Sequence, residues 1–129
     1  MSAIHGVGVD ILRIERMDKA LARHGERLLT RMLGEAELRE VRRRGNTARA
    51  LAMCFAAKEA FVKALGTGFS GIRWRDVGVV RAANGRPQMV FSDAMQARLD
   101  REGIGAVHVS LSDDGGLVCA CVVLERRSA

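Results

Sequence analysis

Residues 55–68, Phe-Ala-Ala-Lys-Glu-Ala-Phe-Val-Lys-Ala-Leu-Gly-Thr-Gly, constrain the fold of this chain more than any other segment. The pattern predicts an alanine-rich helix, entered by a turn near Gly45-Asn46, with large apolar side chains along one side and small side chains along the other. A helix with so little polar surface must be covered on most of its sides. The ending Gly66-Thr67-Gly68 predicts a left-handed helix stop and a tight turn.

Two charged residues of this helix, Glu59 and Lys63, lie one helical turn apart and therefore share a face. A carboxylate in a half-buried position is costly unless it is paired or bound to a cation. We therefore interpret Glu59 as a metal ligand or an ion-pair partner, and Lys63 as a group that is offered to an anion.

The N-terminal segment Ile4–Ile11 alternates as a strand does, which places Gly6, Gly8 and Asp10 on one face. Glycines in a strand permit the close approach of a helix or a ligand, and the small-residue side of the long helix is the natural partner. Asp10 and Glu59 would then converge. Two carboxylates about 4 Å apart repel by roughly 4 kcal/mol at an effective dielectric constant of about 20, so a shared proton or a cation is predicted. Oxygen ligands alone favour Mg²⁺.

Further motifs follow in a characteristic order over nearly the whole chain. They are Gly8-Val-Asp-Ile11, Phe55-Ala-Ala-Lys-Glu-Ala60 with its continuation to Gly68, Asn84-Gly-Arg-Pro87 and Val107-His-Val-Ser-Leu111. With these motifs the chain resembles the bacterial holo-[acyl-carrier-protein] synthases, the small group of phosphopantetheinyl transferases. The Lys-Glu-Ala helix together with the N-terminal Gly-x-Asp is the specific part. The chain departs from many relatives at Cys54, where they carry arginine, and at Asp113, where they carry histidine.

The resemblance implies a fold and an activity. The fold class is α+β, an antiparallel sheet packed on one long buried helix. The activity is transfer of phosphopantetheine from coenzyme A to a serine of apo-acyl carrier protein, with adenosine bisphosphate as by-product, in fatty acid biosynthesis. Asp10 and Glu59 would hold Mg²⁺ on the coenzyme diphosphate, and Lys63 would neutralise charge there, so these three are the expected catalytic residues.

The expected coenzyme contacts are Lys58, Lys63, Gly66, His108 and Ser110. For Lys58 a second interpretation is equally good: its stem packs in the apolar stripe and its head reaches water or phosphate. A histidine on the polar face of a strand is usually a hydrogen-bonded surface group, but the resemblance places the His-Val-Ser segment near the coenzyme. We therefore expect His108 to contact or orient the coenzyme rather than to act as the base.

The segment from Arg13 to Leu28 predicts an amphipathic helix with a break near His24-Gly25. Its outward face is basic, and the net charge of the chain is +6, which favours an acidic partner. A solvated helix face is the alternative, but relatives use a basic first helix against acyl carrier protein. The expected carrier contacts are Arg13, Arg16, Lys19 and Arg23.

The length of 129 residues predicts a single phosphopantetheinyl transferase domain over residues 1–129. The sequence contains neither an apolar run long enough for a membrane span nor a signal-peptide pattern, which favours a cytoplasmic protein without membrane contact. The modest size leaves apolar sheet surface to be covered by another copy. The resemblance implies a homotrimer with coenzyme A in clefts between neighbouring subunits.

Three alternatives stay open at this stage. The same chemistry could serve a specialised polyketide or peptide-synthetase carrier. A basic nucleic-acid-binding module would use the arginines on phosphates, but aromatic residues are only 4% of the chain and no recognition motif is present, so no nucleic-acid partner is expected. In a purely structural interpretation, Asp10 and Glu59 pair with basic neighbours such as Lys63.

The remaining segments predict a scaffold. Residues 28–44 form a helix that is broken near Gly34, and the Asn84-Gly85 turn joins two strands at 77–81 and 88–91. A helix over 93–99 follows, then strands over 107–112 and 117–124. The last strand is nearly continuously apolar, and so it should be central and buried.

Overall fold

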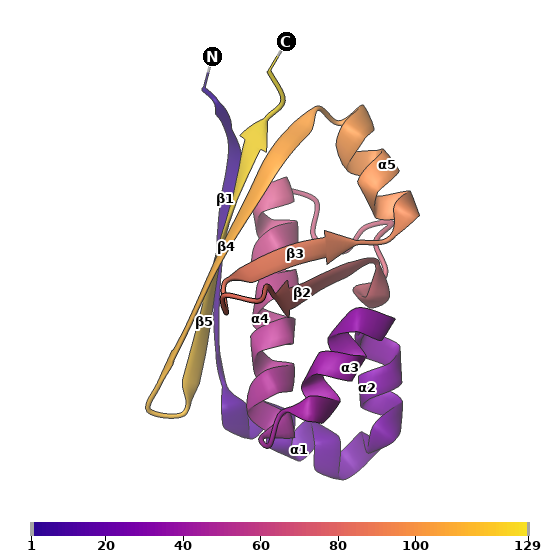
Figure 1. Cartoon of the computed structure of the whole chain (residues 1–129), viewed down its shortest axis with the longest axis vertical. Helices are drawn as coiled ribbons and strands as arrows, with labels where there is room; N and C mark the ends of the chain where they lie inside the picture. Colours follow the sequence, from indigo (N-terminus) through magenta and orange to yellow (C-terminus); the bar gives the residue numbers. More distant parts are fainter. Residues whose placement is uncertain (1, 129) are drawn as a thin grey trace.

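The computed structural model describes residues 2–128 and shows a three-stranded antiparallel sheet packed on one long helix (Figure 1). The strands are β1 (Ile4–Arg13), β2 (Val77–Arg81), β3 (Pro87–Phe91), β4 (Ile104–Asp114) and β5 (Leu117–Arg126). The helices are α1 (Ile14–His24), α2 (Glu26–Met32), α3 (Glu35–Arg43), α4 (Thr47–Leu65), the 3-10 turn η1 (Trp74–Asp76) and α5 (Asp93–Arg101). The predicted α+β class is confirmed.

The main sheet has the order β1-β5-β4, so β5 is its central strand, as its apolar sequence predicted. Alternate side chains of β5, from Val118 to Leu124, are completely buried on the face that packs on α4. The Asn84-Gly85 turn joins β2 and β3 into a separate two-stranded ribbon, with Gly85 at a φ of 85°. In Figure 1 this ribbon lies across α4, and α1 to α3 gather around the N-terminal end of that helix.

Helix α4 lies directly on the glycine face of β1. A Cβ atom added to Gly8 would lie 1.9 Å from the carbonyl oxygen of Ala60, and one added to Gly6 would lie 1.9 Å from that of Ala64. No side chain larger than hydrogen fits at this distance, so the predicted approach of the alanine side of the helix is confirmed. The contact brings the α4 backbone against the strand that carries Asp10.

The ends of α4 and the breaks before it follow local rules. The side chain of Asn46 accepts a hydrogen bond from the Arg49 amide at the start of the helix, and Gly66 ends it in the left-handed conformation at a φ of 90°. Gly25, at a φ of 60°, separates α1 from α2 where a break was predicted. Arg13 is the last residue of β1, so the basic helix begins one residue later than expected. No helix within residues 2–128 is both long and apolar enough to cross a membrane.

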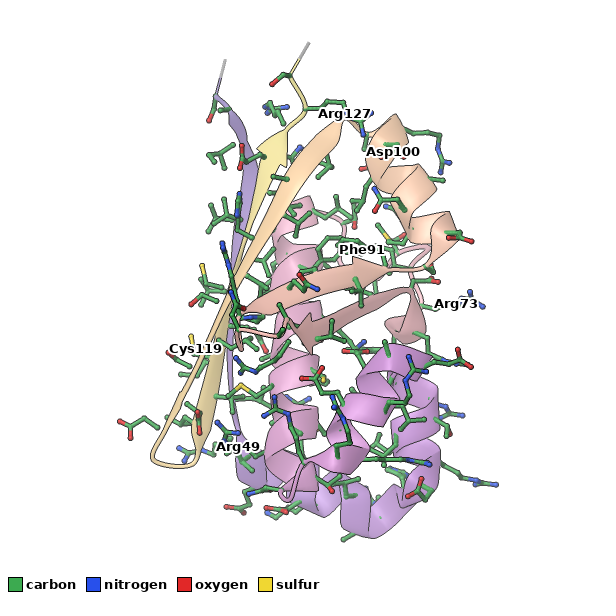
Figure 2. The ribbon with its side chains drawn as sticks, in the orientation of Figure 1. Arg49, Arg73, Phe91, Asp100, Cys119 and Arg127 are labelled. Carbon is green, nitrogen blue, oxygen red and sulfur yellow. The ribbon has the colours of Figure 1, made fainter. Side chains whose placement is uncertain are left out.

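The sheet face opposite α4 is open, and it is apolar along β1. Val7, Val9 and Ile11 of β1 are 57%, 51% and 61% exposed there. The register places Cys121 beside Val9 and Cys119 beside Ile11, and Figure 2 shows Cys119 on the side of the sheet away from α4. We call this surface, formed by the outward side chains of β1, β5 and β4, the outer face.

Candidate active site

Asp10, Glu59 and Lys63 meet where β1 crosses α4. The Lys63 ammonium donates hydrogen bonds to the Asp10 carboxylate, over 3.2 Å to Oδ1, and to the Val9 carbonyl, over 3.0 Å. The Lys63 side chain is 52% exposed and the Asp10 side chain 15% exposed. Glu59 is half-buried one turn before Lys63 on the same helix. The structure therefore brings together the three residues that the sequence predicted as a catalytic group.

The electrostatics of Glu59 show that the two carboxylates influence each other. Its pKa is raised above the ordinary value of 4.5, first because burial disfavours the charged form and second because the negative charge of Asp10 lies nearby. The positive charges of Lys63 and Arg16 act in the opposite direction. Glu59 thus sits in a position where an additional cation would relieve both the burial cost and the repulsion.

The donor set fits a hard divalent cation that is shared with a ligand. Asp10 and Glu59 supply carboxylate oxygens, which Mg²⁺ prefers. Within residues 2–128, however, there is no cluster of three or more histidine, cysteine, aspartate or glutamate side chains that could hold a metal on its own. A cation here would need oxygens from a bound phosphate or from water, which is the usual mode for Mg²⁺ in phosphate-binding sites.

Arg16 extends the site onto α1. Its guanidinium lies over the ring of Phe55, 5.0 Å from the centroid, and Phe55 is one turn before Glu59 on α4. The predicted amphipathic character of α1 is confirmed, because Met17 is buried and Ile14 and Leu21 pack against the core.

The other basic residues of α1 and its start are exposed. Lys19 is held 2.9 Å from Glu15 in a surface ion pair, while Arg13 and Arg23 lie at the two ends of the helix. Arg16 is thus the basic residue of α1 that contacts an aromatic ring of the site, that of Phe55.

Three aromatic rings form a stack beside this arginine. The Trp74 ring lies 5.1 Å from Phe55 and 4.1 Å from Phe69 between centroids, and both pairs are stacked. We call Phe55, Trp74 and Phe69 the aromatic stack. The sequence did not predict this stack, because its members come from α4, the following loop and η1. The only available signal was the spacing of Phe55, one turn before Glu59.

Lys58 does not belong to this surface, which corrects its expected role as a coenzyme contact. Its side chain is 0% exposed, and its ammonium pairs at 2.6 Å with Glu37, itself 1% exposed. The carbonyl oxygens of Trp74 and Val77 accept its other hydrogen bonds. A fully enclosed and fully bonded ammonium is not available to a coenzyme phosphate. Glu37 was not predicted; its place on the buried face of α3, one turn before Val41, was the signal.

His108 and Ser110 do not join the carboxylates within one chain. The register pairs His108 with Val123 and Ser110 with Cys121, so both point to the outer face, whereas Asp10 pairs with buried Ala120 on the α4 side. His108 is exposed and its Nε2 lies 2.5 Å from Glu125 Oε2. Gly66, by contrast, lies at the C-terminal end of α4, one turn beyond Lys63.

The two positions that depart from many relatives, Cys54 and Asp113, each lie near Arg49. Asp113 accepts two 2.8 Å hydrogen bonds from the Arg49 guanidinium, which lowers the pKa of the carboxyl group. Figure 2 shows Arg49 near the N-terminal end of α4, beside the β4–β5 hairpin. Cys54 is buried, burial raises the pKa of its thiol well above 9.0, and its side chain lines a small cavity together with Arg49. Asp113 therefore serves as an ion-pair partner that ties the hairpin to α4.

Comparison with known proteins places this geometry in a family. The family model described as "4'-phosphopantetheinyl transferase superfamily" matches residues 6–122. The chain is 45% identical to the holo-[acyl-carrier-protein] synthase of Thiobacillus denitrificans, over 97% of this chain and 96% of that one. It is 44% identical to the enzyme of the same name from Bordetella pertussis, over 98% of this chain and 86% of the relative.

Solved structures agree with the sequence relatives. The crystal structure of holo-[acyl-carrier-protein] synthase from Neisseria meningitidis superimposes with a TM-score of 0.91 at 36% identity, covering 95% of this chain and 99% of that one. The Helicobacter pylori enzyme in complex with coenzyme A superimposes with a TM-score of 0.81 at 28% identity, covering 92% and 99%. The match over residues 6–122 and these relatives show that the chain belongs to the 4'-phosphopantetheinyl transferase superfamily.

Proposed function

We propose that this protein is a Mg²⁺-dependent holo-[acyl-carrier-protein] synthase that transfers phosphopantetheine from coenzyme A to a serine of apo-acyl carrier protein. The observation that carries the proposal is the pair of carboxylates, Asp10 and Glu59, with Lys63 hydrogen-bonded to Asp10, in a chain of this family. The structure of the Helicobacter pylori relative with coenzyme A supports the choice of donor. The reaction serves fatty acid biosynthesis.

The roles of the site residues follow from charge. Asp10 and Glu59 would hold Mg²⁺, which would neutralise the coenzyme diphosphate and make its phosphorus easier to attack. The carrier serine is the nucleophile; its oxygen forms the new bond to phosphorus as the bond to the adenosine bisphosphate leaving group breaks, and its proton passes to a carboxylate of the site or to water. Lys63 leaves Asp10 for the phosphate oxygens and neutralises the charge that develops there. Gly66, at the end of the same helix, lies against the coenzyme.

We place carrier docking on the exposed basic face of α1. Arg16 lies beside Glu59 on the aromatic stack, so a carboxylate of the carrier that pairs with Arg16 brings the carrier next to the catalytic group. Arg13, Lys19 and Arg23 extend the same positive surface. Charge complementarity of this kind steers encounter and fixes orientation.

We further propose that the active form is a homotrimer with coenzyme A bound between subunits. The exposed apolar side chains Val7, Val9 and Ile11 on the outer face support contact with another copy. His108 and Ser110 also lie on the outer face, opposite Asp10. An interfacial site resolves this separation, because His108 and Ser110 of one subunit then contact the coenzyme held by the carboxylates of its neighbour.

The test is a direct transfer assay. The protein is incubated with coenzyme A, Mg²⁺ and apo-acyl carrier protein, and the carrier is weighed by mass spectrometry for added phosphopantetheine. A carrier whose acceptor serine is replaced by alanine, and a reaction with chelator, are the matched controls. Parallel reactions with polyketide and peptide-synthetase carriers decide the carrier class. An unmodified carrier of every class, with Mg²⁺ present and the protein folded, would contradict the proposal.

A further inference from the structure

The buried Lys58 ammonium sits where three elements join. It donates to Glu37 Oε1 of α3 over 2.6 Å, to the Trp74 carbonyl of η1 over 2.9 Å, and to the Val77 carbonyl at the start of β2. An ammonium group has three N–H donors, so these acceptors saturate it. The buried group that belongs to α4 thus fixes the backbone of η1 and β2 from inside the core.

Glu37 is held just as firmly. Its Oε2 accepts the Val79 amide over 2.9 Å, and its Oε1 also receives the Gly34 amide over 3.4 Å. A Cβ atom at Gly78 would lie 2.8 Å from the Glu37 carboxyl carbon, so glycine at that position makes room for the carboxylate. The pair is therefore a built feature of the interior, with partners for its polar atoms and space reserved around it.

A chain of contacts leads from this pair to the carrier-facing surface. Lys58 holds the Trp74 carbonyl, and the Trp74 ring stacks on Phe69 and Phe55. The guanidinium of Arg16 rests on the far member, Phe55, 5.0 Å from its centroid. Movement of the Trp74 backbone would shift the ring that supports Phe55, and the support of Arg16 would change with it.

Stability alone does not account for such a pair. Replacing a buried ion pair by uncharged side chains of similar volume is often neutral or even stabilising, whereas removal of one partner is strongly destabilising. What an apolar replacement cannot supply is the hydrogen bond from Lys58 to the Trp74 carbonyl. What the ion pair contributes beyond stability is therefore to hold the backbone of η1 in place.

We propose that Glu37 and Lys58 are positioning residues for carrier binding, which fix the aromatic stack through the Trp74 carbonyl and so hold Arg16 in the orientation that meets the carrier. The inference rests on the proposed function, in which the carrier docks on α1. It assigns to Lys58 a role inside the protein in place of a contact to the coenzyme.

The test uses the double variant Glu37→Gln/Lys58→Met, because it leaves no buried charge and keeps an acceptor for the Val79 amide. We expect the variant to fold and its apparent KM for the carrier to rise about 3- to 10-fold. A change of this size is expected when a cation–π and stacking contact is weakened. The KM for coenzyme A should stay within twofold of the original. The emission of Trp74, the only tryptophan, should also shift, and this readout needs no activity.

Two further variants keep the test decisive. Trp74→Leu removes the ring and leaves the ion pair, so it should raise the carrier KM by a similar factor, and combining it with the double variant should add little. Ile104→Ala truncates a buried side chain at the start of β4, a strand that contacts α5; it controls for a general loss of stability and should leave the carrier KM and the Trp74 emission unchanged.

The outcomes separate the two proposals. A folded double variant with unchanged carrier KM and unchanged Trp74 emission would overturn the positioning role, as would equal rises in both KM values or fully additive effects with Trp74→Leu. Absence of transfer by the original protein would instead refute the proposed function, and the emission of Trp74 in the double variant would still report whether the ion pair positions η1.

Discussion

Lys63 and Asp10 form an ion pair of 3.2 Å that bridges α4 and β1. Because the lysine is half-exposed, such a pair contributes little to folding, about 0–1 kcal/mol for surface ion pairs in general. The lysine can therefore leave the carboxylate for a phosphate at small cost. In the proposed function, the position of Lys63 therefore marks where the negatively charged phosphate of the coenzyme binds.

Replacing Asp10 by asparagine should abolish most activity and preserve the fold. The change removes a cation ligand with almost no change in volume, and loss of a comparable electrostatic contact costs about 10²- to 10³-fold in kcat. Initial rates over a range of Mg²⁺ concentrations, together with circular dichroism, measure both effects. An unfolded variant, or one with full activity and unchanged Mg²⁺ dependence, would favour the structural ion-pair interpretation of Asp10.

Replacing Glu59 by glutamine should stabilise the metal-free protein at neutral pH. The folded pKa of Glu59 is raised above 4.5, so the folded state binds more protons than the unfolded state, and stability falls as pH rises from 4.5 through the raised pKa. Glutamine cannot ionise, so this loss disappears. The melting temperature of the variant should exceed that of the original protein at pH 7, and the difference should shrink below pH 4.5.

Mg²⁺ supplies the control for Glu59. Added Mg²⁺ should raise the melting temperature of the original protein and should affect the Glu59→Gln variant much less, because a ligand that binds only the folded state stabilises it. The variant should also lose most transferase activity. A variant that melts lower than the original at pH 7 would mean that Glu59 acts as a stabilising ion-pair partner.

Reversing the charge of Arg16 to glutamate should raise the KM for the carrier by about tenfold or more, with a much smaller effect on the KM for coenzyme A. Lys19→Glu is the matched control on the same helix. Its effect should be smaller, because Lys19 is already paired with Glu15 and lies away from the aromatic stack. High salt should reduce the difference between original and variant. Equal changes in both KM values would reject docking on α1.

The interfacial site predicts that assembly and activity are lost together. Ile11→Asp places a charge on the outer face where the side chain is 61% exposed in the single chain, so folding should persist while the trimer dissociates. Analytical ultracentrifugation and activity over one dilution series measure both. Arg101→Glu, on exposed α5, serves as the surface control. A fully active monomer would refute the shared site.

The sequence predicted the helix, the glycine-faced strand and their approach, because each depends on local periodicity. Gly6 and Gly8 leave room for the close approach of a helix or a ligand, and α4 offers alanines at that face. The same reasoning placed Asp10 and Glu59 at one site. The sequence also predicted that His108 and Ser110 share one face of β4. It did not predict that this face lies opposite Asp10, because that depends on the order of the strands in the sheet.

The contacts of Lys58 could not be predicted from local sequence patterns. It lies in the apolar stripe of α4, but its partner Glu37 is 21 residues away, and its other acceptors are carbonyl groups of η1 and β2. No periodicity specifies such a contact, because the packing of α4 against α3, η1 and β2 creates it. The pairing of Asp113 with Arg49, 64 residues apart, is tertiary in the same sense.

The strand that carries Asp10 is the first of the chain, and its partner in the sheet, β5, is the last. Contacts between residues so distant in sequence form late, because the loop between them must close first. During synthesis, β1 therefore cannot pair with β5 until residues 117–126 have left the ribosome. A nascent chain that contains Asp10, Glu59 and Lys63 but not yet β5 should therefore lack an ordered site, and activity should appear only after residues 117–126 have joined the sheet.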